Sequence, residues 1–156
     1  MKFIADAMLG RLARWLRLMG FDTLYIAGIS DPELIRLAKE QDRTILTRDT
    51  GILKRGVGGC ALIGSDDPFE QLAQVLSELR PGPPGGMRCA NCNGELEAVA
   101  DKEEVADSVP EHVYLSHSRF LRCRSCGGVY WKGSQYRRFR AKLEEITGAA
   151  EGRGGP

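Results

Sequence analysis

Two Cys-x-x-Cys pairs narrow the range of folds open to this chain of 156 residues. The first pair is Cys89 and Cys92, and the second is Cys123 and Cys126. Four thiolates offered on two tight turns match the tetrahedral coordination of Zn²⁺, whereas thiol redox chemistry and disulfides are the alternatives. Because four sulfur atoms fill the tetrahedron, the pattern predicts a structural zinc site. Cys60 lies in an apolar segment and is expected to be a buried thiol.

The segment Arg-Pro-Gly-Pro-Pro-Gly-Gly at 80–86 interrupts regular structure, because its prolines and glycines cannot continue a helix or a central strand. We therefore expect four parts. They are an N-terminal domain at 1–80, a Pro/Gly linker at 81–87, a cysteine module with a C-terminal basic helix at 88–147, and a disordered tail at 148–156.

The N-terminal part alternates between short apolar runs and stretches with helical spacing. The runs predict strands at 2–5, 23–26, 44–46 and 60–63, and the spacing predicts helices at 8–19, 32–40 and 69–79. Strands separated by helices of about ten residues are joined by right-handed crossovers and form a parallel sheet covered on both faces. The expected fold class is therefore α/β.

Three aspartates follow strands of this predicted sheet. Asp6 comes directly after the first strand, Asp31 follows the second after a short loop, and Asp49 lies just past the third. Ligands of an open parallel sheet bind beyond the carboxyl ends of its strands, where these side chains are expected to meet. Carboxylate oxygens suit Mg²⁺ or Mn²⁺, and the matching chemistry is metal-assisted hydrolysis of a phosphodiester.

Helix capping is the alternative explanation for some of these acids. Asp31 precedes Pro32 and is either an N-cap, or free to project while Ser30 and Glu33 form a capping box. Asp67 precedes a proline in the same way and is expected to be a cap. Asp6 and Asp49 have no comparable capping explanation and are the strongest candidates for metal ligands.

Arginines mark a second candidate surface. In the first predicted helix, Arg11, Arg14 and Arg17 lie on one side and the apolar residues on the other. A solvated helix face explains this without a function, but next to an acidic metal site the arginines can hold the backbone of a polyanion. Arg48 precedes Asp49 and is expected to act with them, since a guanidinium pairs well with a phosphate.

Charge is divided sharply within the cysteine module. Residues 94–111 carry seven acidic side chains and one lysine, whereas residues 119–142 carry eight basic side chains and no acid. Aromatic residues are interleaved with the basic ones, and their alternative role is to form the core of the module. Basic and aromatic residues together indicate an RNA or single-strand surface, with Arg122, Arg124, Arg137 and Arg138 as the expected contacts.

Other features exclude whole classes of partner. The formal net charge is +1, so overall charge points to no partner. No apolar run approaches the ~20 residues of a membrane span, and arginines interrupt the apolar N-terminal stretch, so neither a membrane partner nor a secretory signal is expected. Paired cysteines without an export signal favour a reducing, cytoplasmic location. The oligomeric state is not specified.

Several of these motifs occur together in one known family. Residues 6–23, Ser30–Leu34, Arg43–Asp49 and the paired cysteines followed by Tyr130–Gly133 resemble the Mut-seven C-terminal RNase domain, over roughly residues 1–147. The resemblance implies a PIN-like domain fused to a zinc ribbon, and a metal-dependent ribonuclease. It also implies that Asp6, Asp31 and Asp49 form the catalytic core. A further acid of PIN domains would fall on Asp66, Asp67 or Glu33.

The resulting hypothesis is an endoribonuclease that holds Mg²⁺ or Mn²⁺ and uses the zinc ribbon to position single-stranded or structured RNA. One alternative is a non-catalytic RNA- or ribosome-binding zinc-ribbon protein, in which the carboxylates are only caps. The other is a protein-interaction adaptor that uses the acidic segment 94–111 as its contact.

Overall fold

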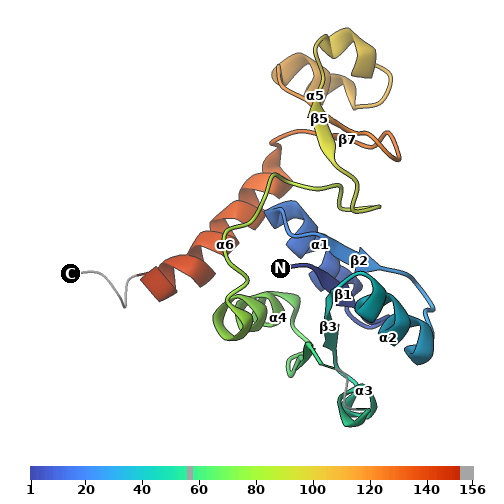
Figure 1. Ribbon diagram of the computed structural model, residues 1–156. Coiled ribbons are helices and arrows are strands. Elements are labelled where there is room, and N and C mark those ends of the chain that lie inside the picture. The colour runs from blue at the N-terminus through green and yellow to red at the C-terminus, as the bar shows by residue number, and fades with distance from the viewer. Residues whose placement is uncertain (56–57, 152–156) are drawn as a thin grey trace. The chain divides into compact units, whose positions relative to one another are not determined.

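A computed structural model describes residues 1–55 and 58–151, and it divides the chain into two compact units, residues 1–95 and 96–156 (Figure 1). The predicted linker at 81–87 and the first Cys-x-x-Cys pair both belong to the first unit. The final helix α6, Ser134–Glu151, continues through the first four residues of the predicted disordered tail. The rest of that tail, residues 152–156, lies outside the described residues.

The first unit contains a four-stranded parallel sheet, as the sequence predicts. Its strands are β1 (Phe3–Ala5), β2 (Thr23–Tyr25), β3 (Thr44–Thr47) and β4 (Cys60–Leu62), in the order β2-β1-β3-β4. In the register, Ala5 lies opposite Tyr25 on one side and Leu46 on the other. All four strands run in the same direction, so their carboxyl ends share one edge.

Three helices connect these strands, and a fourth follows the last strand. They are α1 (Gly10–Met19), α2 (Asp31–Glu40), α3 (Thr50–Lys54) and α4 (Pro68–Gln74), and a π-helical turn, η1 (Val75–Leu79), continues α4. α3 is not visible in the sequence pattern, because five residues including Gly51 are too few to show helical periodicity. The single helix expected at 69–79 is divided between α4 and η1.

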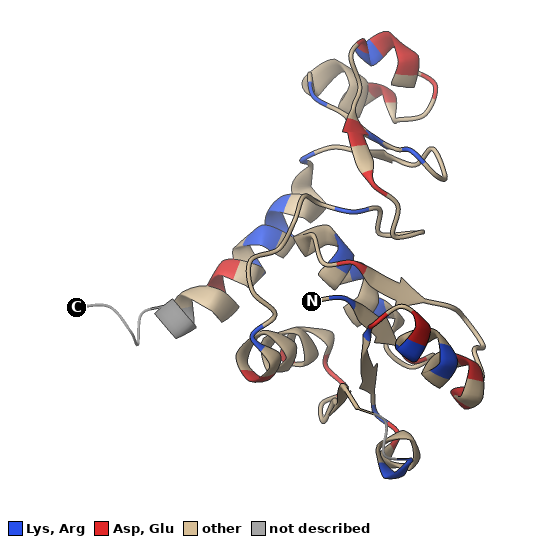
Figure 2. Cartoon of the chain, in the orientation of Figure 1, with Lys and Arg blue, Asp and Glu red and all other residues tan. Residues whose placement is uncertain are grey.

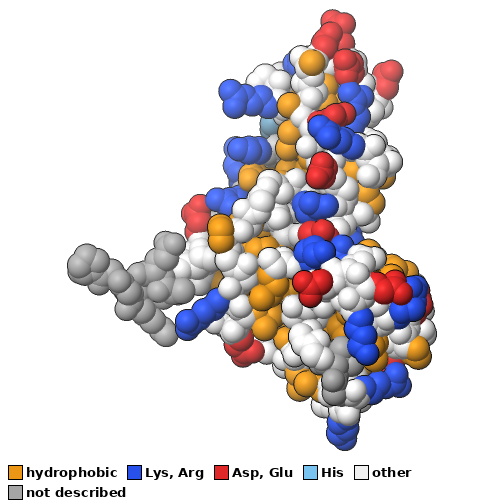
Figure 3. All heavy atoms as spheres, in the orientation of Figure 1, with side chains coloured by type: hydrophobic (Ala, Val, Ile, Leu, Met, Phe, Trp, Pro, Cys, Tyr) orange, Lys and Arg blue, Asp and Glu red, His pale blue; other side chains and the backbone are white. Residues whose placement is uncertain are grey.

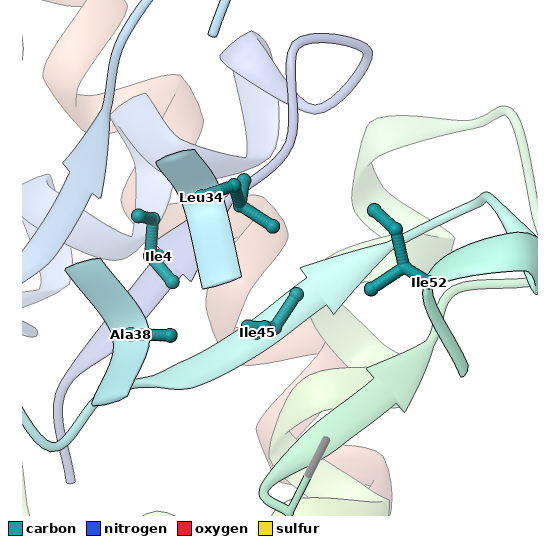
Figure 4. Close-up of a cluster of buried hydrophobic side chains, with 5 residues drawn as sticks. All are labelled: Ile4, Leu34, Ala38, Ile45 and Ile52. Atoms are coloured by element: carbon teal, nitrogen blue, oxygen red, sulfur yellow. The ribbon is translucent and has the colours of Figure 1, made fainter. Parts of the chain in front are cut away.

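One part of the core of the first unit lies between the sheet and α2. Ile4 and Ile45 are neighbours in the sheet, and Leu34 and Ala38 of α2 pack over them (Figure 4). Ile52 of α3 joins the same cluster, in which every member is at most 4% exposed. Phe3 and Ala5 point to the opposite face of the sheet, since alternate residues of a strand do so. Ile4 is thus the residue of β1 that faces α2.

Among the described glycines of this unit, Gly20 has the least room for a side chain. It ends α1 in a left-handed conformation, with φ 101°, and a Cβ atom there would lie 2.1 Å from the carbonyl oxygen of Gly85. The segment around Gly85 crosses at this point and donates a hydrogen bond of 3.2 Å to the Gly20 oxygen. The predicted linker is therefore packed against the end of α1.

Gly20→Ala is expected to lower the free energy of unfolding by about 3 kcal/mol, from the left-handed backbone and the backbone clash together. Gly28→Ala is the matched control, because Gly28 also has a positive φ, 71°, but has no atom within 4 Å of the added Cβ. That control is expected to cost about 1 kcal/mol. Urea denaturation measures both values, and equal losses would mean that the Gly85 segment moves away at little cost.

The second unit is small. Its antiparallel sheet has strands β5 (Leu96–Ala98), β6 (Leu121–Cys123) and β7 (Val129–Tyr130), and between β5 and β6 lie the 3-10 helix η2 (Lys102–Val105) and α5 (Glu111–Ser116). Its core consists of Val105, Val109, Val113 and Phe120, with Trp131 packed against them. Phe120 and Trp131 thus have the packing role that was the alternative for the aromatics. Within the described ranges, none of the helices has both the length and the apolar composition needed to cross a membrane.

Candidate active site and metal centre

The candidate active site lies at the topological switch point of the parallel sheet, where the strand order reverses. From β1 the chain passes to β2 on one side, and from β2 it crosses back to β3 on the other side of β1. Such a switch point leaves a crevice beyond the carboxyl ends of the two central strands, where ligands of parallel sheets bind. Asp6 directly follows β1, and Asp49 lies two residues beyond the end of β3. The topology thus brings the two strongest sequence candidates to the same edge of the sheet.

Thr47 connects the two aspartates. Its hydroxyl group donates to Asp6 Oδ2 at 2.5 Å, and the Thr47 hydroxyl oxygen accepts the backbone N–H of Asp49 at 2.9 Å. Thr47 is fully buried at the end of β3, so its rotamer is held by the surrounding packing. The threonine therefore sets the position of both acids relative to the sheet.

Asp6 is itself held tightly. It is 7% exposed, and its Oδ1 accepts the Met8 N–H at 3.0 Å while its Oδ2 also accepts the Arg48 N–H at 3.2 Å. Together with the Thr47 hydroxyl these are three donors, whereas a carboxylate offers about four acceptor sites. Asp6 is thus a fixed negative charge at the switch point.

Asp49 has a capping role that the sequence analysis did not foresee. It is the N-cap of α3, and its Oδ1 accepts the Gly51 N–H at 2.7 Å. The cap was missed because α3 itself was not predicted. Asp49 is exposed, so the cap leaves this carboxylate open to solvent.

Asp31 is the first residue of α2, and Ser30 is the N-cap. The Ser30 hydroxyl oxygen accepts the Glu33 N–H at 3.4 Å, so of the two alternatives for Asp31, the structure has the one in which serine caps the helix. Glu33 forms an ion pair with Arg36, which lowers the pKa of the Glu33 carboxyl, chiefly through their hydrogen bond. Asp67 caps α4 as predicted, with its Oδ1 accepting two backbone N–H groups at 2.9 and 3.0 Å.

The three aspartates share one edge of the sheet without forming a compact cluster. Within residues 1–55 and 58–151, one set of His, Cys, Asp or Glu side chains has three or more ligand atoms all within 4.8 Å of one another, and it is the four cysteines. Asp6, Asp31 and Asp49 are therefore farther apart than the members of that set.

The arginines of α1 divide into two kinds. Arg11 and Arg14 are exposed, whereas Arg17 is 4% exposed. The guanidinium of Arg17 donates from Nε to the Thr23 carbonyl oxygen at 2.8 Å and from Nη1 to the Ala90 carbonyl oxygen at 2.9 Å. The expected three-arginine surface thus comprises Arg11 and Arg14 in this helix, while Arg17 is part of the interior.

Asp22 lies at the opposite edge of the sheet, in the loop before β2. Its Oδ1 accepts from Arg43 Nη1 and from Asn93 Nδ2, each at 2.7 Å. Burial acts to raise the pKa of Asp22, but the hydrogen bonds from Arg43 and Asn93 and the charges of Arg43 and Arg88 outweigh it and hold the pKa below its ordinary value. The ionised carboxylate therefore stabilises the folded state above the unfolded-state pKa, and this contribution is lost as the pH falls through the folded-state pKa.

Asp22→Asn is expected to lower the free energy of unfolding by about 2 kcal/mol at pH 7, because it removes a charged acceptor from Arg43. The difference from wild type should begin to shrink below about pH 4, where the Asp22 carboxyl gains a proton in the unfolded state, and should disappear as the pH falls through the lower folded-state pKa. Urea denaturation at pH 7 and pH 3, with a chelator present throughout, measures this difference. Asp42→Asn is the control, since Asp42 is an exposed acid and asparagine tolerates its left-handed φ of 52°. A difference for Asp22→Asn that does not change with pH would contradict the argument.

The four paired cysteines form the second candidate site. Cys89, Cys92, Cys123 and Cys126 have sulfur atoms that all lie within 4.8 Å of one another. The backbone N–H groups of Ser125 and Cys126 point to the Cys123 sulfur at 3.4 and 3.5 Å, which favours a thiolate there. Four sulfur ligands in this arrangement fit a tetrahedral Zn²⁺, as the sequence predicts.

Cys60 is separate from this set. It is half-buried in β4 and packs against the core of the first unit. Burial raises the pKa of the Cys60 thiol, and the negative charge of Asp6 adds to this effect. Cys60 therefore stays protonated, as an apolar core thiol.

Basic and acidic residues of the second unit partly neutralise one another. Arg122 pairs with Glu104 at 2.6 Å, and Arg124 pairs with Glu97 at 3.1 Å. Acidic residues gather around η2 and basic residues along α6 (Figure 2), and side chains of both signs adjoin on the visible face (Figure 3). Arg137 and Arg138 of α6 are exposed. Of the predicted RNA contacts in this unit, these two therefore lie outside the ion pairs to β5 and η2.

Comparison with known proteins agrees with this arrangement. The sequence model of one family, described as the Mut7-C RNAse domain, matches residues 1–143. The chain belongs to that family. The match spans the first unit and part of the second. It includes the three aspartates and the four paired cysteines. No curated protein and no solved structure matches the chain. Membership in an RNase domain family implies a ribonuclease-like role, with RNA as the class of substrate.

Proposed function

We propose that this member of the Mut7-C RNAse domain family is a metal-dependent endoribonuclease that hydrolyses RNA at the switch point of its first unit. One observation carries the proposal: the Thr47 hydroxyl bonds both the Asp6 carboxylate and the Asp49 backbone N–H, at the carboxyl ends of neighbouring parallel strands. A negatively charged pair at the ligand-binding edge of a parallel sheet would repel a phosphate. It therefore makes chemical sense as a cation site.

Asp6, Asp31 and Asp49 would hold Mg²⁺ or Mn²⁺. Their oxygen atoms suit a hard cation, and Mg²⁺ is commonly bound by only one or two carboxylates, with water and substrate phosphate oxygens completing the shell. One or two of the three acids would therefore bind such a cation directly, and the others would act through its bound water. When bound, the metal lowers the pKa of a water molecule and stabilises the leaving oxygen. Thr47 orients the Asp6 carboxylate, and Asp6 and Asp49 supply negative charge at fixed positions.

Arginines of the first unit would bind the RNA backbone. Arg11 and Arg14 are exposed on the helix that follows Asp6, and Arg48, which is half-buried, lies between Thr47 and Asp49. In the second unit, Arg137 and Arg138 are the exposed candidates on α6. Each contact between an arginine and a phosphate adds to the salt dependence of binding, so the affinity for RNA should fall steeply as the salt concentration is raised. The zinc ribbon would thus position the RNA.

Cleavage of an end-labelled single-stranded RNA, with Mn²⁺ or with EDTA, tests the proposal. Internal fragments that appear only with the metal would support an endoribonuclease. RNA binding measured by fluorescence anisotropy at low salt, without any metal-dependent cleavage, would instead support a non-catalytic RNA-binding protein, in which Asp49 is only the cap of α3. A chain that neither cleaves nor binds RNA would favour the protein-interaction adaptor.

A further inference from the structure

The turn that carries the first pair of cysteines is hydrogen-bonded into the first unit. Arg17 of α1 makes two of these contacts: its carbonyl oxygen accepts the Arg88 N–H, and its guanidinium donates to the Ala90 carbonyl oxygen, each at 2.9 Å. Ala90, which lies between Cys89 and Cys92, is 3% exposed. The cysteine turn is thus part of the packed structure around α1.

Asn93 makes the second connection, immediately after Cys92. Its Oδ1 accepts the Thr23 N–H of β2 at 3.0 Å, and its Nδ2 donates to Asp22 at 2.7 Å. The backbone of Asn93 is left-handed, with φ 68°, and its N–H donates to the Cys89 carbonyl oxygen at 2.9 Å. The place of the Asn93 amide therefore depends on the turn that begins at Cys89.

These contacts satisfy polar groups that are buried. Thr23 is 0% exposed, Arg17 is 4% exposed and Asn93 is 9% exposed. β2 is an edge strand of the sheet, paired only with β1, so the Asn93 amide takes the place of a further strand at Thr23. A buried donor or acceptor that loses its partner costs about 1–3 kcal/mol. Displacement of the turn would therefore destabilise β2 and the end of α1.

We infer that the turn Cys89–Cys92 stabilises the first unit in a metal-dependent way. Zinc bound by the four cysteines fixes this turn, and through Arg17 and Asn93 it stabilises β2 and α1 of the nuclease-like unit. Coupling between two equilibria is reciprocal, so Arg17 and Asn93 in turn raise the affinity of the cysteines for zinc. They act as positioning residues for the zinc turn. The inference concerns stability and metal affinity and does not depend on the proposed activity.

The two tryptophans allow a direct test in the full chain. Trp15 of α1 stacks on Phe69 at 4.0 Å between ring centroids, so in a Trp131→Phe background the fluorescence reports on the first unit. The measurement is the midpoint of thermal unfolding with zinc and with chelator. Asn93→Gly removes the amide but keeps a residue that accepts a positive φ, and Arg17→Met removes the guanidinium. Asn91→Gly in the same turn and Arg14→Met on the same helix are the controls, since both residues are exposed.

Zinc is expected to raise the Trp15 midpoint of the parent by about 5 °C. The shift should fall to half or less in Asn93→Gly and Arg17→Met, and stay unchanged in both controls. Competition with a chelator should show about tenfold weaker zinc binding for Asn93→Gly. Hydrogen exchange at the Thr23 amide should speed up when zinc is removed, a readout that needs no variant. A parent midpoint that does not respond to zinc, or an unreduced shift in Asn93→Gly, would overturn the inference.

Discussion

Asp49→Asn is expected to lower the metal-dependent cleavage of single-stranded RNA by about 100-fold or more, with little change in stability. Asparagine is as good an N-cap as aspartate, so the Gly51 N–H keeps its acceptor and α3 is retained. The substitution removes the negative charge and the stronger ligand for a hard cation. The value of kcat/KM in Mn²⁺ measures the loss, and a urea titration checks the fold.

Asp67→Asn is the matched control for this prediction. Asp67 caps α4 through its Oδ1 just as Asp49 caps α3, and it too follows a strand of the sheet, β4. Although Asp67 is one of the positions for a further PIN-type acid, its Oδ1 is taken by two backbone N–H groups of α4 and it follows the edge strand β4, so we assign it to capping alone. Its replacement should leave cleavage within about twofold of wild type. Equal activity of the two variants would mean that Asp49 is only a cap, and would favour the non-catalytic alternative.

Asp6→Asn is a poorer variant for the same question, because of its surroundings. Both oxygens of Asp6 accept hydrogen bonds, from the Met8 and Arg48 N–H groups and from the Thr47 hydroxyl. An asparagine NH₂ group would face one of these donors in a site that is 7% exposed. A loss of activity in this variant would have two causes, misfolding and loss of charge, because an unsatisfied buried donor destabilises the fold.

Removal of zinc is expected to unfold the second unit, which is the largest stability effect that we foresee. Its strands have three, three and two residues, and the cluster of buried apolar side chains between them and η2 and α5 has four members. A unit of this size rarely folds on hydrophobic burial alone, whereas a structural zinc supplies on the order of 10 kcal/mol of apparent binding free energy. Without the metal, the four thiol groups contribute none of this.

Cys123→Ser tests this prediction, because Cys123 is a buried member of the set. Native mass spectrometry should show one zinc per chain in wild type and much less in the variant. NMR spectra should show that residues 96–130 lose their dispersed signals. Cys60→Ala is the control, since it removes a thiol that lies outside the cluster, and it should retain one zinc. A variant with full zinc content and native dispersion would contradict the structural role of the metal.

Much of the architecture is visible in local sequence patterns. The parallel sheet follows from apolar runs that alternate with helical stretches, and it brings Asp6 and Asp49 to one edge as expected. The cysteine cluster follows from the spacing of the two pairs, and the cap at Asp67 from its proline neighbour. These features depend on residues close in sequence or on the direction of the strands. α3 was missed because it is shorter than two helical turns.

The different positions of Arg14 and Arg17 could not be read from such patterns. Both follow the same spacing on α1, yet Arg14 is exposed and Arg17 is buried. The difference arises because Arg17 meets the Ala90 carbonyl oxygen, 73 residues away along the chain. Likewise, nothing near Asn93 indicates that its amide completes the edge of β2. Local periodicity predicts which face of a helix is polar, but burial of a polar group depends on the distant partner that satisfies it.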